Sequence, residues 1–524
     1  MELAIGDVGA VPHRLIMVEA ISALVGTDGQ PRDGAPLGAL LSAHAAVTPH
    51  APAFSITGST TSFCHIDEAS NRRARLLADR YAVTKGDRVA ISLPNRVEFM
   101  EAVFAVWKLG AIPCPLSHRA SPAECGKLLE LIDPRCVVGS GGLPTSRSLL
   151  HNVDRDSIQE LSCEPLPPLA VTPGRIMNSG GSTGGPKLIS DPNPSAWGAD
   201  KSGRRCSPRS TILLPAPLYH SAPFAYAVMA LAQGSHLVCM DRFDPGEWLD
   251  AVEQYRPSWV YMVPTMMSRI AKLPNDITQH ANLSSIETLI HMAAPCPPQV
   301  KRWWIDRIGP ERVLEVYGGT ERIGAAAIDG VQWLEHPGSV GQASPGFEAM
   351  IIGEDGEVLP PGEIGEIYFR GSSGPGANYK YIGSDTRIRG GLDSFGDMGW
   401  MDAEGWLYLS DRRTDMVLIG GVNVYPAEVE AALETLPGVL CAAVIGLPDP
   451  DIGNRLHAIL ELAPEQTPPA DAFDFVTPAL AGLAGVKRPR SFEFTFDRIR
   501  DDAGKLRRFQ LRADRIGPAF EETP

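Results

Sequence analysis

The chain has 524 residues, which is too long for a single hydrophobic core and indicates two to four domains. Its formal net charge of -15 argues against a nucleic-acid partner, because binding to phosphate backbones requires an excess of Lys and Arg. The nine cysteines are scattered and include no C-x-x-C pair, so they predict a reducing compartment and no zinc site. We see neither a secretory signal nor an apolar run that could span a membrane, and we expect a cytoplasmic protein.

Strands and helices alternate through the first part of the chain. Residues 89–93 form an apolar run, and apolar residues then recur at helical spacing until Gly110, with Asn95 expected to cap this helix. The scheme recurs between strands near 211–215 and 236–240. Such alternation predicts layered α/β sheets, whose ligands bind at the carboxyl ends of strands. Three further short strands are predicted within 258–264, 286–294 and 312–319.

The pattern changes after about residue 410. The segment 399–409 before this point has a turn signature between two apolar runs and predicts a structural hairpin. The remaining 110 residues or so are enough for a small α+β domain. Its predicted elements are a short helix within 426–436 and strands within 438–446 and 455–462. Two polar stretches rich in Pro or Gly, 191–210 and 465–472, are predicted surface loops.

The stretch NSGGSTGGPKLI, residues 178–189, is the first candidate site. A phosphate-binding loop needs inward-pointing backbone N–H groups, hydroxyl donors and a cation, and this stretch provides all three. It is not a Walker loop, because Pro186 separates the last glycine from the lysine. It also contains G-x-S-x-G, the nucleophile elbow of serine hydrolases, with Ser182 as the attacking group. From the loop alone, a phosphate site, a hydrolase elbow and a plain flexible loop remain open. The candidate phosphate-binding residues are Ser179, Gly180, Gly181, Ser182, Thr183, Gly184 and Lys187.

Other motifs decide between these alternatives. SGGSTGGPK resembles the phosphate-binding motif of the adenylate-forming superfamily, which includes acyl-CoA synthetases, peptide-synthetase adenylation domains and luciferases. Four further motifs resemble that family in the same order, and the resemblance extends over nearly all of the chain after residue 35. It excludes the serine elbow. The four motifs are YGGTE (317–321), SFGDMGW (394–400), DRRTDMVLIGGVNVYPAEVE (411–430) and GKLRR (504–508).

The resemblance implies an α/β architecture with a small mobile domain at the carboxyl end. Residues 1–35 would be an extension of unknown role, and residues 36–411 an ATP- and acid-binding domain of layered α/β sheets. Residues 412–415 would be a hinge, and residues 416–524 a mobile α+β domain that swings between two half-reactions. The hinge pivot is often Asp or Lys in this family, but here it is Thr414.

The resemblance also implies a reaction that uses ATP, Mg²⁺ and CoA. A carboxylate would attack the α-phosphate of ATP to give acyl-AMP and pyrophosphate, and CoA would then displace AMP. Neither step needs a protein nucleophile, so catalysis would depend on positioning and charge stabilisation. One alternative is an adenylating enzyme that transfers a carboxylic or other oxyacid to an amine or a carrier protein. A non-catalytic binding relative is disfavoured, because the acidic and lysine residues of the motifs are intact.

The motifs imply a role for each matching residue. Lys505 and Thr320 would act at the α-phosphate, and Glu321 would hold Mg²⁺, which prefers carboxylate and phosphate oxygens. Asp397 accepts hydrogen bonds only, as two ribose hydroxyl donors require. Without their motifs, these residues would be interpreted as solvated or turn residues. The adenine and ribose set is Ala294, Pro295, Tyr317, Gly318, Asp397 and Arg412, and the CoA set is Gly420 and Gly421. The family commonly has a proline shortly before the GK motif, where this chain has Ile499 and Arg500.

The acid pocket is expected to be neutral and apolar. No acidic residue in its segments can pair with an α-amine, so amino acids are disfavoured and a bulky hydrophobic, ring-bearing acid is expected. Several stretches resemble ligases of bile-acid and steroid side-chain acids. His220 would be a catalytic gate residue, with a core histidine as the alternative. The other partners would be ATP and CoA, with a monomer or a homodimer left open. The expected pocket residues are Tyr219, His220, Phe224, Met262 and His291.

Overall fold

The computed structural model describes most of the chain, which divides into two compact units. The first comprises residues up to 178 together with 190–214 and 218–241, and the second comprises 179–189, 215–217 and everything from 242 onward. No helix among the described residues is both long enough and apolar enough to cross a bilayer. The described ranges are 19–139, 149–151, 158–179, 187–198, 205–384, 386, 388–412, 415–419, 422–501 and 504–516, with the backbone alone at 149–151, 179, 411 and 412.

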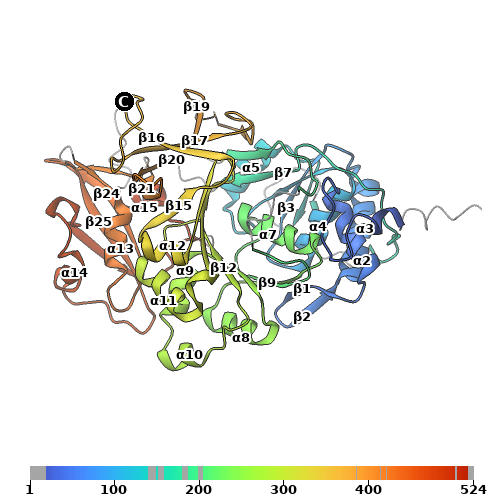
Figure 1. Cartoon of the computed structure of the whole chain (residues 1–524), viewed down its shortest axis with the longest axis horizontal. Coiled ribbons are helices and arrows are strands. Elements are labelled where there is room, and N and C mark those ends of the chain that lie inside the picture. Colours follow the sequence, from blue (N-terminus) through green and yellow to red (C-terminus); the bar gives the residue numbers. More distant parts are fainter. Residues whose placement is uncertain are drawn as a thin grey trace, which may run out of the picture. The chain divides into compact units, whose positions relative to one another are not determined.

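The first unit contains two sheets and several helices (Figure 1). One sheet is parallel, with strand order β4-β3-β5-β6, and confirms the predicted strand at 89–93 as β3. The other has the order β9-β10-β1-β2 and is parallel except for the hairpin β1–β2. Helices α2, α3 and α4 pack against one another. The bounds are α2 Leu37–Val47, β1 Pro52–Ile56, β2 Ser59–Ser62, α3 Phe63–Tyr81, β3 Arg88–Ser92, α4 Val97–Lys108, β4 Ile112–Pro115, α5 Pro122–Ile132, β5 Cys136–Gly139, β6 Leu149–His151, β9 Thr211–Leu214, α7 Ser221–Ala232 and β10 His236–Cys239.

Asn95 does not cap α4, and that prediction was wrong. The helix begins at Val97 after Arg96, and no side chain caps it. The buried Asn95 amide instead donates to the Met240 carbonyl oxygen at 2.9 Å and accepts from the Leu218 backbone N–H at 2.8 Å. A buried amide must satisfy both its donors and its acceptor, and the loops after β9 and β10 provide the partners. Asn95 therefore links the carboxyl ends of strands that are distant in sequence.

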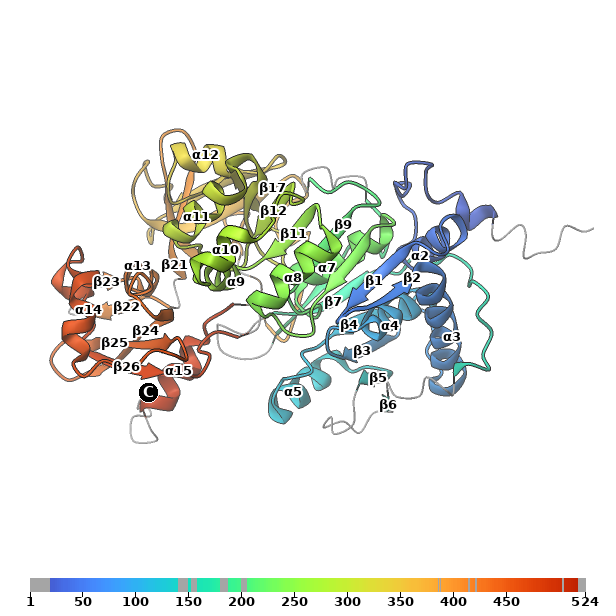
Figure 2. The same ribbon diagram turned by 90° about the horizontal axis from the view of Figure 1, so that it is seen from below.

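A long mixed sheet forms much of the second unit. Its strand order is β16-β17-β20-β21-β15-β14-β13-β12-β11, with β11, β12 and β13 parallel and the others antiparallel. The three strands predicted within 258–319 are confirmed as β11–β13, and the hairpin within 399–409 as β20–β21. Helices α9 and α11 pack together (Figure 2). The bounds are α8 Pro245–Tyr255, β11 Trp259–Met262, α9 Pro264–Ala271, α10 Asn275–His280, β12 Thr288–His291, α11 Pro298–Ile308, β13 Val313–Gly318, β14 Ala325–Asp329, α12 Gly330–Glu335, β15 Ser339–Ala343, β16 Phe347–Ile352, β17 Gly365–Gly371, β18 Lys380–Ile382, β19 Ile388–Arg389, β20 Leu392–Met401 and β21 Leu407–Arg412.

The region after residue 416 has a hydrophobic core of its own. Fifteen buried residues between Val417 and Leu480 form one cluster, to which β22, β24, β25, α13 and α14 all contribute. The separate α+β domain expected at residues 416–524 stays a prediction, because this region belongs to the second unit together with residues 242–415. The hinge expected at 412–415 lies within the second unit, with residues 413 and 414 outside the described part, and its role stays a prediction. The bounds are β22 Val417–Ile419, β23 Val422–Val424, α13 Pro426–Leu433, β24 Val439–Asp449, β25 Gly453–Leu462, α14 Ala472–Leu480, β26 Ser491–Thr495 and α15 Arg508–Ile516.

Candidate active site

Strands β13, β20 and β21 bring together three residues predicted to bind adenine and ribose. The Tyr317 hydroxyl donates to Asp397 Oδ2 at 2.7 Å. Asp397 is paired in register with Arg412 on the neighbouring strand. The Tyr317 ring also packs on Phe395, with ring centroids 5.9 Å apart. The phenol therefore orients the carboxylate that is predicted to accept from the ribose.

The turn after β13 requires a glycine at its centre. A Cβ at Gly319 would lie 2.4 Å from Cε1 of Phe395 and 2.9 Å from Glu321 Oε2, which is closer than side chains allow. The turn then passes through Thr320 and Glu321, both half-buried, and reaches Arg322 at a φ of 56°. Because Gly319 has no Cβ, the side chains of Phe395 and Glu321 can both approach the backbone of this turn.

Glu321 meets two side chains from other segments. The Tyr381 hydroxyl of β18 donates to Glu321 Oε1 at 2.6 Å. The Lys187 ammonium lies 3.9 Å from the same oxygen and 4.0 Å from the centroid of the Tyr381 ring. Lys187 begins β8 (Lys187–Asp191), directly after the candidate phosphate loop. The structure therefore brings Lys187 of the SGGSTGGPK motif next to Glu321 of the YGGTE motif. The sequence did not indicate Tyr381.

Lys505 lies in a turn held by backbone and side-chain bonds. Its N–H donates to Asp501 Oδ1 at 2.9 Å, and its carbonyl accepts from the Asp501 N–H at 2.9 Å. The Arg500 guanidinium donates to the Gly504 carbonyl at 3.1 Å and to Glu434 Oε1 at 3.3 Å. Arg500, which stands in the segment that departs from the family pattern, thereby connects the lysine turn to the end of α13.

Part of the predicted site lies outside the described residues. Ser179 and Arg412 are described by their backbones alone, in β7 (Arg175–Ser179) and β21. Ala294 is half-buried and Pro295 exposed after β12, next to Ala293 at a φ of 80°. Such a positive φ is unusual for alanine and is typical of constrained turns at binding sites. The predicted residues outside the described part are Gly180, Gly181, Ser182, Thr183, Gly184, Gly420 and Gly421.

Three residues predicted to line the acid pocket lie in the first unit, at the start of α7. His220 precedes the helix as its N-cap residue, and its ring centroid lies 4.4 Å from that of the buried Tyr219. Phe224 is fully buried, with its ring 6.4 Å from Phe99 and 6.0 Å from Trp107. Phe224 is thus part of the core of this unit. The acid-binding roles of the three residues stay predictions.

The other two predicted pocket residues, Met262 and His291, are fully buried neighbours on β11 and β12. Residues paired in register on parallel strands face the same side of the sheet, so His291 shares its face with Glu315 of β13. The Lys301 ammonium of α11 donates a hydrogen bond to Glu315 Oε2 at 2.5 Å. Burial, and secondarily the charge of Lys301, lowers the pKa of His291 well below its usual value, so the ring is neutral. Its role in acid binding stays a prediction.

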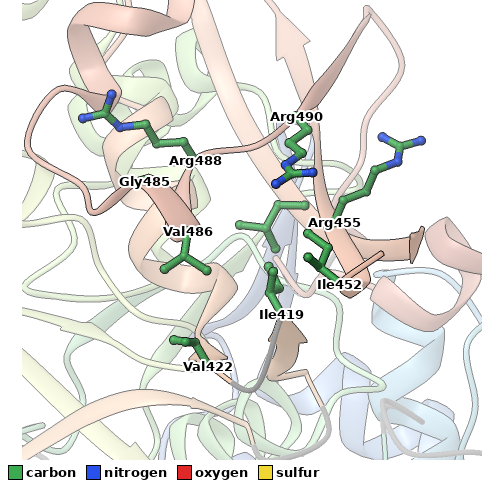
Figure 3. A pocket seen from close by; sticks show the side chains of 9 residues that line it. Ile419, Val422, Ile452, Arg455, Gly485, Val486, Arg488 and Arg490 are labelled. Atoms are coloured by element: carbon green, nitrogen blue, oxygen red, sulfur yellow. The ribbon is translucent and has the colours of Figure 1, made fainter. Parts of the chain in front are cut away.

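A pocket in the region after residue 416 was not predicted from the sequence. It has a volume of about 350 Å³ and lies beside the hairpin β22–β23, which flanks Gly420 and Gly421. In Figure 3 the guanidinium group of Arg490 lies among the lining side chains, and those of Arg455 and Arg488 extend outward. Arg488 and Arg490 of its lining belong to the basic stretch KRPR, residues 487–490. The pocket is lined by Ile419, Val422, Ile452, Arg455, Leu456, Gly485, Val486, Arg488 and Arg490.

The donor set at Glu321 fits a metal that is shared with the nucleotide. Among the described residues, no three His, Cys, Asp or Glu side chains cluster as a metal cage. Mg²⁺ does not need such a cage, since it binds through one or two carboxylates, several waters and substrate phosphates. One carboxylate beside a lysine and a phosphate loop meets that requirement.

Known proteins resemble this chain over most of its length. A family model described as AMP-binding enzyme matches residues 41–374. A feruloyl-CoA synthase from Amycolatopsis sp. is 33% identical over 490 residues, which are 89% of this chain and 96% of the relative.

Solved structures agree with the sequence relatives. The o-succinylbenzoate CoA synthetase from Bacillus subtilis, in complex with its acyl-adenylate intermediate, has a TM-score of 0.76 and 26% identity, covering 92% of this chain and 99% of that one. The same enzyme with ATP and magnesium ion has a TM-score of 0.74 and 26% identity, over 90% and 99% of the two chains. These comparisons give no support to the expected likeness to bile-acid ligases. The chain belongs to the AMP-binding enzyme family and is an ATP-dependent acid–CoA ligase that acts through an acyl-adenylate.

Proposed function

We propose that this ligase activates a ring-bearing hydrophobic carboxylic acid. The observation that carries this proposal is that segments 218–226, 262–267 and 288–295 contain no acidic side chain to pair with an amine. They also contain Met262 and Met266, whose flexible side chains adapt to irregular apolar bodies. The names of the relatives support it, because ferulic acid and o-succinylbenzoic acid both carry an aromatic ring.

The proposed roles in the first half-reaction follow the geometry around β13. Tyr317 and Asp397 would hold adenine and ribose, and Glu321 would take Mg²⁺ bound to the phosphates. Lys187 would face the phosphates released as pyrophosphate. Lys505 would place its ammonium between the attacking carboxylate and the α-phosphate, where negative charge develops. The bound metal would neutralise phosphate charge, while these side chains orient the nucleotide.

The pocket beside β22–β23 is proposed to bind the phosphates of CoA. Arg488 donates to the backbone carbonyls of Leu483 and Ala481, and Arg455 donates to the Ser491 hydroxyl. These partners are neutral, so the guanidinium charges remain available to phosphate. The apolar side chains of the lining offer a surface for the adenine ring. Arg488→Ala should raise the KM for CoA about tenfold, as expected for the loss of one charged contact, and leave pyrophosphate release from ATP unchanged.

The nine cysteines, all of them free thiols, support the proposed cytoplasmic location.

An acid panel tests the proposed substrate class. Pyrophosphate release and thioester formation are measured with acetate, alkanoates of increasing length, cinnamates, benzoates and amino acids, with and without CoA. Ring-bearing acids should give the highest kcat/KM, and AMP should form with no ADP. A preference for acetate or an amino acid would refute the substrate proposal. Pyrophosphate release without any acyl-CoA would show an acceptor other than CoA.

A further inference from the structure

Tyr381 contacts two of the groups proposed to hold magnesium and phosphate. Its hydroxyl donates to Glu321 Oε1 at 2.6 Å, and its ring lies beneath the Lys187 ammonium at 4.0 Å. Lys187 and Glu321 are also within 3.9 Å of each other. The three residues belong to segments about 60 to 190 residues apart in the sequence, so one phenol joins elements that the fold alone brings together.

The position of this phenol is set by a packed aromatic neighbourhood. The Tyr379 ring meets Tyr381 edge to face, with centroids 4.9 Å apart. Tyr379 is buried with Ile189 and Ile323, and its hydroxyl donates to Asp393 Oδ1 at 3.3 Å. Burial and the Asp393 charge raise the pKa of Tyr379, so this hydroxyl remains a donor. Tyr381 therefore extends from a rigid support rather than from a free loop.

We propose that Tyr381 is a positioning residue for the magnesium–ATP complex. Its hydroxyl fixes the Glu321 carboxylate, and the face of its ring attracts the Lys187 ammonium. Without the phenol, the Lys187 ammonium would move closer to Glu321 than the 3.9 Å of the present ion pair and would bind the carboxylate more tightly. That pair would compete with the metal for the carboxylate and with the phosphates for the lysine. The inference rests on the proposed roles of Glu321 and Lys187.

Two substitutions separate the two contacts of the phenol. Tyr381→Phe keeps the ring and removes the donor, so the affinity for metal should fall about tenfold, as for other partners of metal ligands. The KM for ATP at saturating Mg²⁺ should stay close to that of the wild type. Tyr381→Leu removes both contacts, so the KM for ATP should also rise several-fold, because Lys187 is then no longer held apart from Glu321.

Metal binding can be measured without turnover. Mn²⁺ is titrated into the whole protein with a non-hydrolysable ATP analogue, and free Mn²⁺ is followed by electron paramagnetic resonance. Tyr408→Phe is the matched control, because Tyr408 donates to Asp402 in the β20–β21 hairpin at 3.3 Å. This control should bind Mn²⁺ as the wild type does. Circular dichroism verifies that each variant is folded.

Glu321→Gln distinguishes a failure of the Tyr381 proposal from a failure of the proposed metal role of Glu321. A loss of Mn²⁺ affinity in both Glu321→Gln and Tyr381→Phe supports the proposal. A loss in Glu321→Gln with wild-type affinity in Tyr381→Phe overturns the role of Tyr381 and leaves the proposed function intact. Wild-type affinity in Glu321→Gln overturns the metal role of Glu321, and the role of Tyr381 with it.

Discussion

Gly504, the residue before the proposed catalytic lysine, is a sensitive position for testing how the two half-reactions differ. Gly504 adopts a φ of 75°, which favours glycine. A Cβ there would lie 2.7 Å from Oγ1 of Thr265 and 3.2 Å from Cγ2 of Val263, at the end of β11 and the start of α9. Gly504→Ala should therefore strain the turn itself and also its contact with Thr265.

The two contributions have different sizes and different dependence on conformation. The left-handed backbone costs alanine about 1–2 kcal/mol wherever the turn keeps its shape, and thus in both half-reactions. The clash with Thr265 applies only while the turn packs against α9. Val263 is buried, so the turn must move instead, and a displacement approaching 1 Å at a reacting group can cost about 10²-fold in rate. The resemblance to the family implies that the turn leaves this position when CoA reacts.

Two assays isolate the steps. Pyrophosphate release with acid and ATP should slow by about 10- to 100-fold in Gly504→Ala, and thioester formation from supplied acyl-AMP should slow much less. Thr265→Ala added to Gly504→Ala should restore part of the first rate, because it removes the clash and leaves the backbone strain. Equal losses in both half-reactions, or no restoration by Thr265→Ala, would refute the reasoning.

Three further outcomes are expected. Lys505→Ala should slow acyl-AMP formation by about 10²–10³ and spare thioester formation from supplied acyl-AMP, whereas equal damage to both steps would contradict its role. Lys301→Ala should lower the free energy of unfolding in urea by about 3–5 kcal/mol, because the buried carboxylate of Glu315 loses its partner; a loss below 1 kcal/mol would contradict this. Burial lowers the pKa of His236 from 6.5 to about 4, so the unfolded chain takes up the proton first and stability falls as the pH drops from 6.5 towards 4. The free energy of unfolding in urea should drop between pH 7 and pH 5 by about 2 kcal/mol less in His236→Gln than in the wild type. Equal drops in the two proteins would exclude His236 as the source of the pH dependence.

Local sequence patterns were sufficient to predict many of the strands and the enzyme family. The apolar runs within 258–264, 286–294 and 312–319 are strands, because a strand buried between helices shows a continuous apolar run. The order of the glycine-rich and acidic motifs was enough to predict an adenylate-forming enzyme, since each motif lies within a few residues. The sequence also predicted that Tyr317 and Asp397 serve one nucleotide; the structure places the two side chains 2.7 Å apart, and their nucleotide roles stay predictions.

Contacts between distant segments were decided by the tertiary structure alone. Asn95 stands where a helix cap is expected, yet its amide bonds loops more than 120 residues away because those loops surround it. Tyr381 lies 60 residues from Glu321, and no motif marks it. Arg500 departs from the family pattern in sequence, but its bond to Glu434, 66 residues away, exists only once the end of α13 and the lysine turn are packed together. Local motifs predict which side chains can bind ATP or take part in catalysis. The orientation of those side chains depends on how helices and strands that are distant in the sequence pack together.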